Sequence, residues 1–542
     1  MKRNAALSAM LLIFIGMMIA LLVLTESKKV KEYVNEVETE NGIGSSYDER
    51  SLKIISSTEN KDLEPIILEY ANRHDMQITI DYAGTLEMMD ILNGGADYDA
   101  VWASNSIWLY MLEDNVKITE TKSTSINPII FAVKDSKATE LNFKGRDIYT
   151  HEIVSAIQNG QLKFNMSNPT QTNSGATAYL GLLSTLAGNP EVLKLDHIVN
   201  EELKNNMKIL FNGLQRSSGS DEYLETMFLN GEYDAIVAYE STIINLNKKL
   251  SLTYQEPLYA LYPIDGVSIA DSPLSFVERE DNLGKKELFL EFQNYILGTE
   301  GQNELERYAR RTWFGGVKKD VDFDTYNPNW GIDTTRYIVP IKFPSKTIIE
   351  EALKLYQNEF RKPIYTIFAL DYSGSMSGSG YKQLCDAMEY ILTDDAEADL
   401  LHYGEKDKIT VIPFSTGVID VWNTTNGKET RNLLNNILNL KPSGSTNIYD
   451  TGITALDQIR AEDFDTYNVS VIIMTDGLSN MGSYSSFEVK YNIENVDVPF
   501  YSIMFGSAFE DELQDIADLT NGKVFDGKTD LLKAFKEVRG YN

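Results

Sequence analysis

The chain has 542 residues, too many for a single hydrophobic core, so two or three domains are expected. Its formal net charge of −31 argues against nucleic acid or anionic lipid as the main partner, because like charges repel. A single cysteine, Cys385, excludes an internal disulfide, and the four histidines are scattered without the spacing of metal ligands.

The N-terminal segment begins with residues 1–4, of which Lys2 and Arg3 are basic, and continues as an uncharged apolar run over residues 5–24. This run is long enough to cross a bilayer as a helix, and no small-x-small cleavage site precedes Thr25. We therefore expect an uncleaved transmembrane anchor, with a cleaved signal peptide as the alternative. Residues 25–50 are polar and charged and are expected to form a spacer.

Residues 51–316 alternate short strands with helices, which predicts a parallel α/β arrangement. Strands are expected at 52–55 and 76–81, helices at 63–71 and up to residue 92, and a strand that crosses to a second lobe at 127–133. The sequence Tyr98-Asp99-Ala100 is echoed by Tyr233-Asp234-Ala235. The echo predicts two similar lobes, with a return crossing near residues 258–263.

Four features of this region resemble the bacterial extracellular solute-binding proteins of ATP-driven importers, of the two-lobed type 2 periplasmic-binding class. They are the Ser/Thr-rich loop after residue 55, the two Tyr-Asp-Ala sequences, the helix start at residues 172–175, and the sequence at residues 310–316. The resemblance implies a two-lobed module with a small solute held between the lobes.

Loop residues of this module are the candidate solute contacts. Exposed amides at a helix start such as residues 172–175 favour an anion, so the expected solute is small and anionic. The same residue types also serve as ordinary helix caps and turns, and this alternative stays open. The candidates are Ser57, Thr58, Ser104, Asn105, Thr172, Asn173, Ser174, Gly175 and Tyr239.

Residues 317–362 are expected to be a linker that contains a helix at 346–360, since apolar residues there recur with helical spacing. Residues 363–542 predict a complete doubly wound domain with a parallel sheet. Strands are expected at 364–371, 409–414, 469–475 and 499–504, with an edge segment at 418–422, and helices at 431–440, 448–459, 510–519 and 531–538.

Oxygen-bearing side chains follow the strands of this last domain. The strand that ends at Asp371 leads into a loop with Ser373 and Ser375, and Gly374 and Gly378 supply the backbone freedom for it to curl. A hard divalent cation needs about six oxygen ligands, so further ligands must come from other loops. Parallel strands expose their carboxyl ends on one edge, which brings Thr446 and Asp476 to the same place.

The pattern Asp-x-Ser-x-Ser, then Thr, then Asp, resembles the von Willebrand factor type A family and its metal-ion-dependent adhesion site, MIDAS. This resemblance implies a Mg²⁺ or Mn²⁺ ion with few anionic ligands and an open position for an acidic side chain of a partner. Asp450, one helical turn after Thr446, is a candidate for orienting the metal ligands by hydrogen bonds without contacting the metal itself. The alternative is a set of Ser/Gly-rich surface loops without metal.

These features together predict a bacterial surface protein, anchored by a single-pass membrane helix, with the bulk of the chain extracytoplasmic. Its metal domain is expected to bind an acidic protein partner, while the solute-binding-like module senses a ligand or serves as scaffold. The alternative is a tethered solute receptor of an ATP-driven importer. No enzymatic activity is expected, because no histidine, paired carboxylate or phosphate loop accompanies the metal motif.

Overall fold

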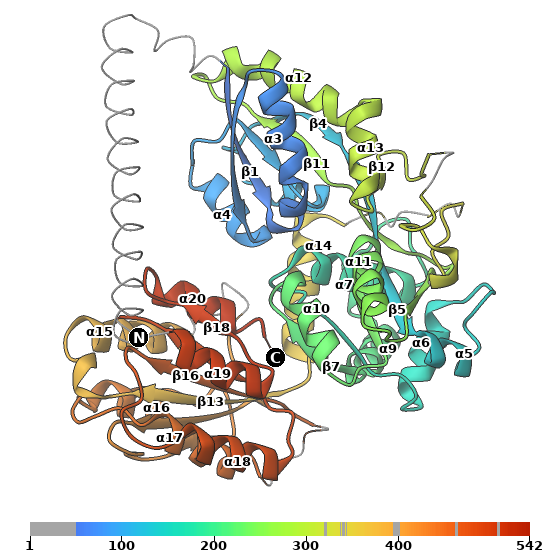
Figure 1. Ribbon diagram of the computed structural model, residues 1–542. Coiled ribbons are helices and arrows are strands. Elements are labelled where there is room, and N and C mark those ends of the chain that lie inside the picture. Colours follow the sequence, from blue (N-terminus) through green and yellow to red (C-terminus); the bar gives the residue numbers. More distant parts are fainter. Residues whose placement is uncertain are drawn as a thin grey trace, which may run out of the picture.

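The computed structural model describes residues 50–541, apart from gaps at 319–321, 336–337, 339–341, 343, 394–400, 461–463, 465 and 507–509. In this part of the chain the strands form three sheets, one in each lobe of the N-terminal module and one in the C-terminal domain (Figure 1). The expected membrane helix at 5–24 and most of the spacer lie outside the described residues. Within the described residues, no helix combines the length and the apolar character that a membrane span requires.

Lobe 1 is built on the sheet β2-β1-β3-β11-β4, in which β1, β2 and β3 run parallel and β11 runs antiparallel to its neighbours. The strands are β1 (Ser51–Ser57), β2 (Gln77–Ala83), β3 (Ala100–Trp102), β4 (Ile118–Ser123) and β11 (Pro273–Val277). The helical segments are η1 (Thr58–Leu63), α3 (Glu64–Arg73), α4 (Thr85–Asn93), η2 (Ser106–Met111), η3 (Leu283–Lys285), α12 (Lys286–Leu297) and α13 (Thr299–Arg307).

Lobe 2 is built on the sheet β10-β5-β8-β6-β7, with β9 and β12 also paired to β5. The strands are β5 (Ser125–Lys134), β6 (Phe164–Ser167), β7 (Leu214–Ser218), β8 (Ala235–Tyr239), β9 (Leu258–Leu261), β10 (Ser268–Ala270) and β12 (Arg311–Thr312). The helices are α5 (Asp135–Glu140), α6 (Thr150–Gln158), α7 (Asn173–Leu186), α8 (Leu195–Ile198), α9 (Glu201–Asn212), α10 (Asp221–Asn230) and α11 (Glu240–Leu252).

The chain crosses between the two lobes after β4, after β10 and again after α13. The chain leaves lobe 1 between β4 and β5, as expected, but it returns between β10 and β11 and not near residues 258–263. Residues 258–261 form β9, which pairs antiparallel to β5 and therefore stays in lobe 2. Both stretches are short and apolar, and only the pairing partner decides which one crosses back.

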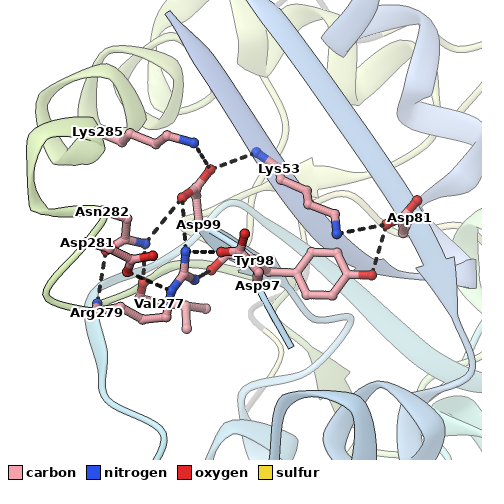
Figure 2. Close-up of polar contacts among 10 residues, drawn as sticks. All are labelled: Lys53, Asp81, Asp97, Tyr98, Asp99, Val277, Arg279, Asp281, Asn282 and Lys285. Atoms are coloured by element: carbon pink, nitrogen blue, oxygen red, sulfur yellow. Dashed lines mark hydrogen bonds and ion pairs between the residues drawn. The ribbon is translucent and has the colours of Figure 1, made fainter. Parts of the chain in front are cut away.

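The repeated Tyr-Asp-Ala sequence has the same structural role in each lobe. In lobe 1 the buried Asp99 carboxylate accepts a hydrogen bond from the backbone N–H of Lys53 in β1 at 3.0 Å (Figure 2). It also forms an ion pair with Lys285 at 2.9 Å. In lobe 2 the Asp234 carboxylate accepts the backbone N–H of Lys163, at 2.9 Å, just before β6. Each aspartate thus ties the start of its strand to the neighbouring parallel strand.

The linker carries η4 (Pro328–Trp330), α14 (Lys346–Leu355) and the π-helical turn η5 (Tyr356–Phe360). The helix α14 packs on lobe 2, where Tyr179 of α7 donates a hydrogen bond to the carbonyl of Ala352 at 2.6 Å. Lys204 of α9 binds Glu359 at 2.8 Å. The entrance to the C-terminal domain is therefore fixed to lobe 2.

The C-terminal domain is doubly wound, as expected, on the sheet β15-β14-β13-β16-β17-β18. Only β15 is antiparallel to its neighbour. Its strands are β13 (Ile364–Asp371), β14 (Lys408–Phe414), β15 (Trp422–Thr424), β16 (Asn468–Thr475), β17 (Phe500–Met504) and β18 (Val524–Asp526). Its helices are η6 (Gly374–Met376), α15 (Ser379–Ile391), α16 (Arg431–Asn439), α17 (Ile448–Ile459), α18 (Tyr484–Glu494), α19 (Glu510–Thr520) and α20 (Leu531–Val538).

Candidate metal centre and inter-lobe cleft

Asp371 is the last residue of β13, the strand between β14 and β16, and its side chain is fully buried. One carboxylate oxygen accepts a hydrogen bond from the backbone N–H of Ser373 at 2.7 Å. The other accepts the hydroxyl of Thr475, at the end of the adjacent β16, also at 2.7 Å. The parallel pairing of β13 and β16 therefore holds the carboxylate between two loops at one edge of the sheet.

The hydroxyls of Ser373 and Ser375 lie 2.9 Å apart, and that of Ser375 donates to Asp476 Oδ1 at 2.8 Å. Ser373 and Asp476 are buried, whereas Ser375 is exposed. The four side chains from Asp371 to Asp476 thus form a continuous oxygen-rich chain that reaches the protein surface.

Thr446 is 3% exposed and lies in the third loop of this edge. Its backbone N–H donates to Asn480 Oδ1 at 3.0 Å, and its carbonyl accepts the N–H of Asn480 at 3.0 Å, so it is tied to the loop that follows Asp476. The carbonyl of Gly444 accepts the N–H of Gly374 at 3.0 Å, which ties the Thr446 loop to the Asp371 loop. All three loops are therefore connected in pairs, and the five predicted residues are brought to one edge.

The two glycines expected to let the first loop curl have different roles. Gly378 has φ +94°, a conformation that favours glycine, as predicted. Gly374 begins the short helix η6 with no positive φ, and a Cβ there would lie 3.3 Å from the carbonyl of Gly444. Gly374 is thus needed for close approach of two loops and not for backbone freedom.

Asp450 lies in the first turn of α17 and is exposed. Its carboxylate accepts a hydrogen bond from Asn447 Nδ2 at 2.8 Å, and Asn447 also donates to the carbonyl of Thr416 at 3.2 Å. Asp450 therefore supports Asn447, the residue that follows Thr446.

The donor set at this edge fits a hard divalent cation. Burial raises the pKa of both Asp371 and Asp476, and for Asp371 the groups that oppose this rise are the neutral hydrogen-bond donors Thr475 and Ser373 and not a basic side chain. A buried carboxylate without a cationic neighbour is costly, and a bound cation would offset that cost. The described residues contain no group of three or more His, Cys, Asp or Glu side chains that could hold a metal ion.

Most of the predicted solute residues meet at the junction of the two lobes, where they bind one another. Ser57 accepts hydrogen bonds from the backbone and hydroxyl of Ser104, at 3.0 and 3.3 Å. Asn105 reaches from lobe 1 to Thr177 of lobe 2 at 3.2 Å. Thr58 is exposed, and its hydroxyl lies 3.4 Å from the Glu59 carboxylate.

The start of α7 shows capping geometry. The hydroxyl of Thr172 accepts the N–H of Gly175 at 3.0 Å, so Thr172 is the N-cap. Asn173 bonds to both Tyr239 and Trp108, which joins the lobes. A Cβ on Gly175 would lie 2.4 Å from the carbonyl of Ser167, so this glycine permits close packing of α7 on β6.

The hydroxyl of Ser174, which was expected to face an anion, already holds a carboxylate of the chain itself. Ser174 and Ser167 both donate to Asp221 Oδ1, each at 2.5 Å. The position at the start of α7 where a solute anion was expected is therefore occupied by a carboxyl group of the chain itself.

Two residues that were not predicted from the sequence, Glu59 and Asp221, lie near each other at the junction of the two lobes. Burial, followed by the nearby Asp221 carboxylate, raises the pKa of Glu59 to about 7. Arg310 donates to the carbonyl of Glu59 and to the carboxylate of Asp62, each at 3.0 Å. Glu59 comes from lobe 1 and Asp221 from lobe 2, so nothing in either local sequence pairs them.

Comparison with known families identifies both parts of the chain. Residues 52–310 match the family described as bacterial extracellular solute-binding protein. Residues 367–536 match the von Willebrand factor type A domain, and the candidate metal centre lies within this match.

Individual relatives match only part of this chain, and the chain spans about a sixth of the length of the curated relatives that it matches. Inter-alpha-trypsin inhibitor heavy chain H3 from Bos taurus is 30% identical over 157 residues, which is 27% of this chain and 17% of that protein. The periplasmic binding protein AfuA from Actinobacillus pleuropneumoniae is 13% identical with a TM-score of 0.41, over 57% of this chain and 98% of that one. A von Willebrand factor type A protein from Catenulispora acidiphila has 16% identity and a TM-score of 0.28, over 34% of this chain and 43% of that one.

Proposed function

We propose that this chain is an extracytoplasmic protein that binds an acidic protein partner through a divalent metal. It joins an extracellular solute-binding domain, residues 52–310, to a von Willebrand factor type A domain, residues 367–536. In this proposal the solute-binding domain senses a small ligand or serves as a second binding surface. The apolar run at residues 5–24 would anchor the chain to the bacterial cell membrane.

The observation that carries the proposal is the connected set of oxygens at the carboxyl edge of β13 and β16. A Mg²⁺ or Mn²⁺ ion would be held by Asp371, Ser373, Ser375, Thr446 and Asp476. When bound, the ion would supply an open coordination position for a carboxylate of the partner. Ser375 is exposed, so a partner can reach this edge.

The direct test removes the innermost carboxylate. Asp371→Ala is expected to abolish Mg²⁺ binding in isothermal titration calorimetry and to lose every partner that wild-type protein captures from cell-surface material only in the presence of Mg²⁺. Asp386→Ala is the control, because Asp386 is an exposed carboxylate of the same domain that pairs with Lys382 at 3.5 Å. Partner capture that survives both Asp371→Ala and a chelator would exclude the metal-dependent role.

The inter-lobe cleft supports a second candidate, a tethered solute receptor that delivers its ligand to an importer. A groove with space for a small molecule is lined by residues of both lobes, among them Ser106 of lobe 1 and Ile269 of lobe 2. A rise in melting temperature on addition of a small solute, of the same size with and without Mg²⁺, would favour this candidate. We also infer that the chain is not an enzyme, because its metal motif contains no histidine or other recognisable general base.

A further inference from the structure

The C-terminal end of the chain, which we call the C-terminal segment (residues 531–541), lies against the loops of lobe 2 that lead into α7 and α10. Gln171 Nε2 donates to the carbonyl of Lys536 at 3.0 Å, and Asn168 Nδ2 donates to that of Gly540 at 3.3 Å. The hydroxyl of Tyr541 donates to Ser220 Oγ at 3.1 Å.

The fit between these surfaces is close. A Cβ on Gly540 would lie 1.7 Å from Gln171 Oε1, and a Cβ on Gly219 would lie 2.5 Å from the ring of Tyr541. The rings of Tyr223 and Tyr541 meet with centroids 5.2 Å apart. A small change in the position of either loop must therefore disturb the C-terminal segment, because packed surfaces yield little.

The same two loops reach the cleft on their other side. Asn168 contacts the C-terminal segment, while its neighbour Ser167 bonds to the cleft carboxylate of Asp221. Ser220 Oγ accepts a hydrogen bond from the hydroxyl of Tyr541, and Asp221 is the next residue in the chain. Neighbouring residues in each loop thus serve the cleft and the C-terminal domain.

The C-terminal segment also touches lobe 1. Lys533 of α20 forms an ion pair with Glu87 of α4 at 2.7 Å. Arg216 of lobe 2 binds the hydroxyl of Tyr501 at 2.9 Å, which fixes the rest of the domain to lobe 2. The domain is therefore attached to one lobe and contacts the other, so a change in the angle between lobes must alter the contact at Lys533.

We propose that the C-terminal segment couples the von Willebrand domain to the arrangement of the two lobes, so that the state of the cleft and the docking of this domain are linked. By reciprocity, whatever stabilises one lobe arrangement shifts docking, and loss of docking shifts the lobes by the same free energy. The biological use of this coupling, in which a solute in the cleft controls the domain that binds the partner, rests on the proposed function.

The test follows hydrogen exchange of backbone amides in the full chain, at residues 57–60 and 104–107 of lobe 1 and at 168–175 and 217–221 of lobe 2. Gly540→Val is expected to undock the segment and to raise exchange about tenfold in the loops of both lobes. Lys533→Glu breaks an exposed ion pair, so a rise of about twofold to fourfold in the lobe 1 loops is expected.

A charge swap supplies the matched control, and it involves only surface residues that the fold tolerates. Glu87→Lys should reproduce the effect of Lys533→Glu, and the double variant should return exchange to that of the wild type. Lys528→Glu, at an exposed position of the same domain, should change nothing. Exchange that rises only in the lobe 2 loops, or that the double variant does not restore, would show a passive attachment and would overturn the coupling.

Solute binding is read separately, by native mass spectrometry of the unmodified chain for a bound small molecule. A chain without one, but with the expected exchange pattern, would remove the solute role and support the coupling. A bound molecule together with unchanged lobe 1 exchange in Gly540→Val would overturn the coupling alone.

Discussion

At the scale of single residues, the protonation of Glu59 is the feature most open to measurement. Burial, reinforced by the Asp221 carboxylate, raises its pKa from 4.5 to about 7, and Arg310 opposes this only in part. The folded state therefore binds this proton more tightly than the unfolded state. The resulting stabilisation is fully present below pH 4.5 and is lost as the pH rises towards 7.

Glu59→Gln should remove this pH dependence. The variant and the wild type are expected to have similar free energies of unfolding near pH 4, and at pH 8 the variant should be more stable by about 2 kcal/mol. Urea denaturation at the two pH values measures the difference. Glu222→Gln, an exposed neighbour of Asp221, is the control and should follow the wild type. A stability difference between Glu59→Gln and wild type that does not change with pH would contradict the assignment.

Residue-level prediction from sequence succeeded where side chains belong to a strand end and failed where they meet across lobes. The positions of Asp371 and Asp476 follow from buried parallel strands that end in oxygen-bearing loops, which sequence periodicity reveals. Glu59 and Asp221 are far apart in sequence and on different lobes, so their approach depends on the tertiary arrangement. The role of Thr172 was hard to predict for another reason. Helix capping and ligand binding use the same type of hydroxyl, and here the hydroxyl caps α7.

At the scale of elements, β12 is fixed to lobe 2 by a fully buried ion pair. Arg311 donates to the two carboxylate oxygens of Glu240 at 2.8 and 2.6 Å, and neither side chain is exposed. Tyr262 also donates to the same carboxylate. The pair therefore holds the chain to lobe 2 at the point where it leaves α13 for the linker.

Arg311→Ala is expected to lower the free energy of unfolding by about 3 to 5 kcal/mol, because it leaves the buried Glu240 carboxylate without its cationic partner. Replacing both members by apolar residues, as in Arg311→Met with Glu240→Leu, should recover most of that loss. Arg307→Ala is the control, since its ion pair with Glu304 is exposed on the arginine side, and its effect should stay below about 1 kcal/mol. Urea unfolding of the four proteins checks the series, and equal losses for Arg311→Ala and Arg307→Ala would contradict it.

Elements were predictable when their pattern was one-sided and their neighbours were close in sequence. Helix α17 was expected at its observed bounds, Ile448–Ile459, because its apolar residues lie on one face. Helix α18 was not predicted, since only Phe487 and Tyr491 are buried there and its other positions follow no one-sided pattern. The return crossing was misplaced because strand pairing, and not local composition, decides whether a strand belongs to lobe 1 or lobe 2.

At the scale of the whole molecule, the von Willebrand domain and lobe 2 are joined by a buried polar interface, and not only by the linker. Arg216 is almost fully buried, and its guanidinium donates to the hydroxyl of Tyr501 at 2.9 Å and to the carbonyl of Asn521 at 3.2 Å. Tyr223 donates to the carbonyl of Asn521 at 2.6 Å. We therefore expect the two domains to unfold cooperatively.

Arg216→Ala should uncouple the unfolding of the two domains, because it removes a charged donor from two acceptors, one of them the buried Tyr501 hydroxyl. The expected loss of interface free energy is about 2 to 4 kcal/mol. Differential scanning calorimetry is expected to show two separate transitions in the variant where the wild type unfolds in one. Arg460→Ala, which removes an exposed arginine of the same domain, should keep the wild-type profile. The variant should still bind Mg²⁺ with wild-type affinity, because Arg216 binds Tyr501 and Asn521 and not the candidate metal residues. A single transition in Arg216→Ala would show that the other contacts between this domain and the lobes keep unfolding cooperative, and it would contradict the prediction.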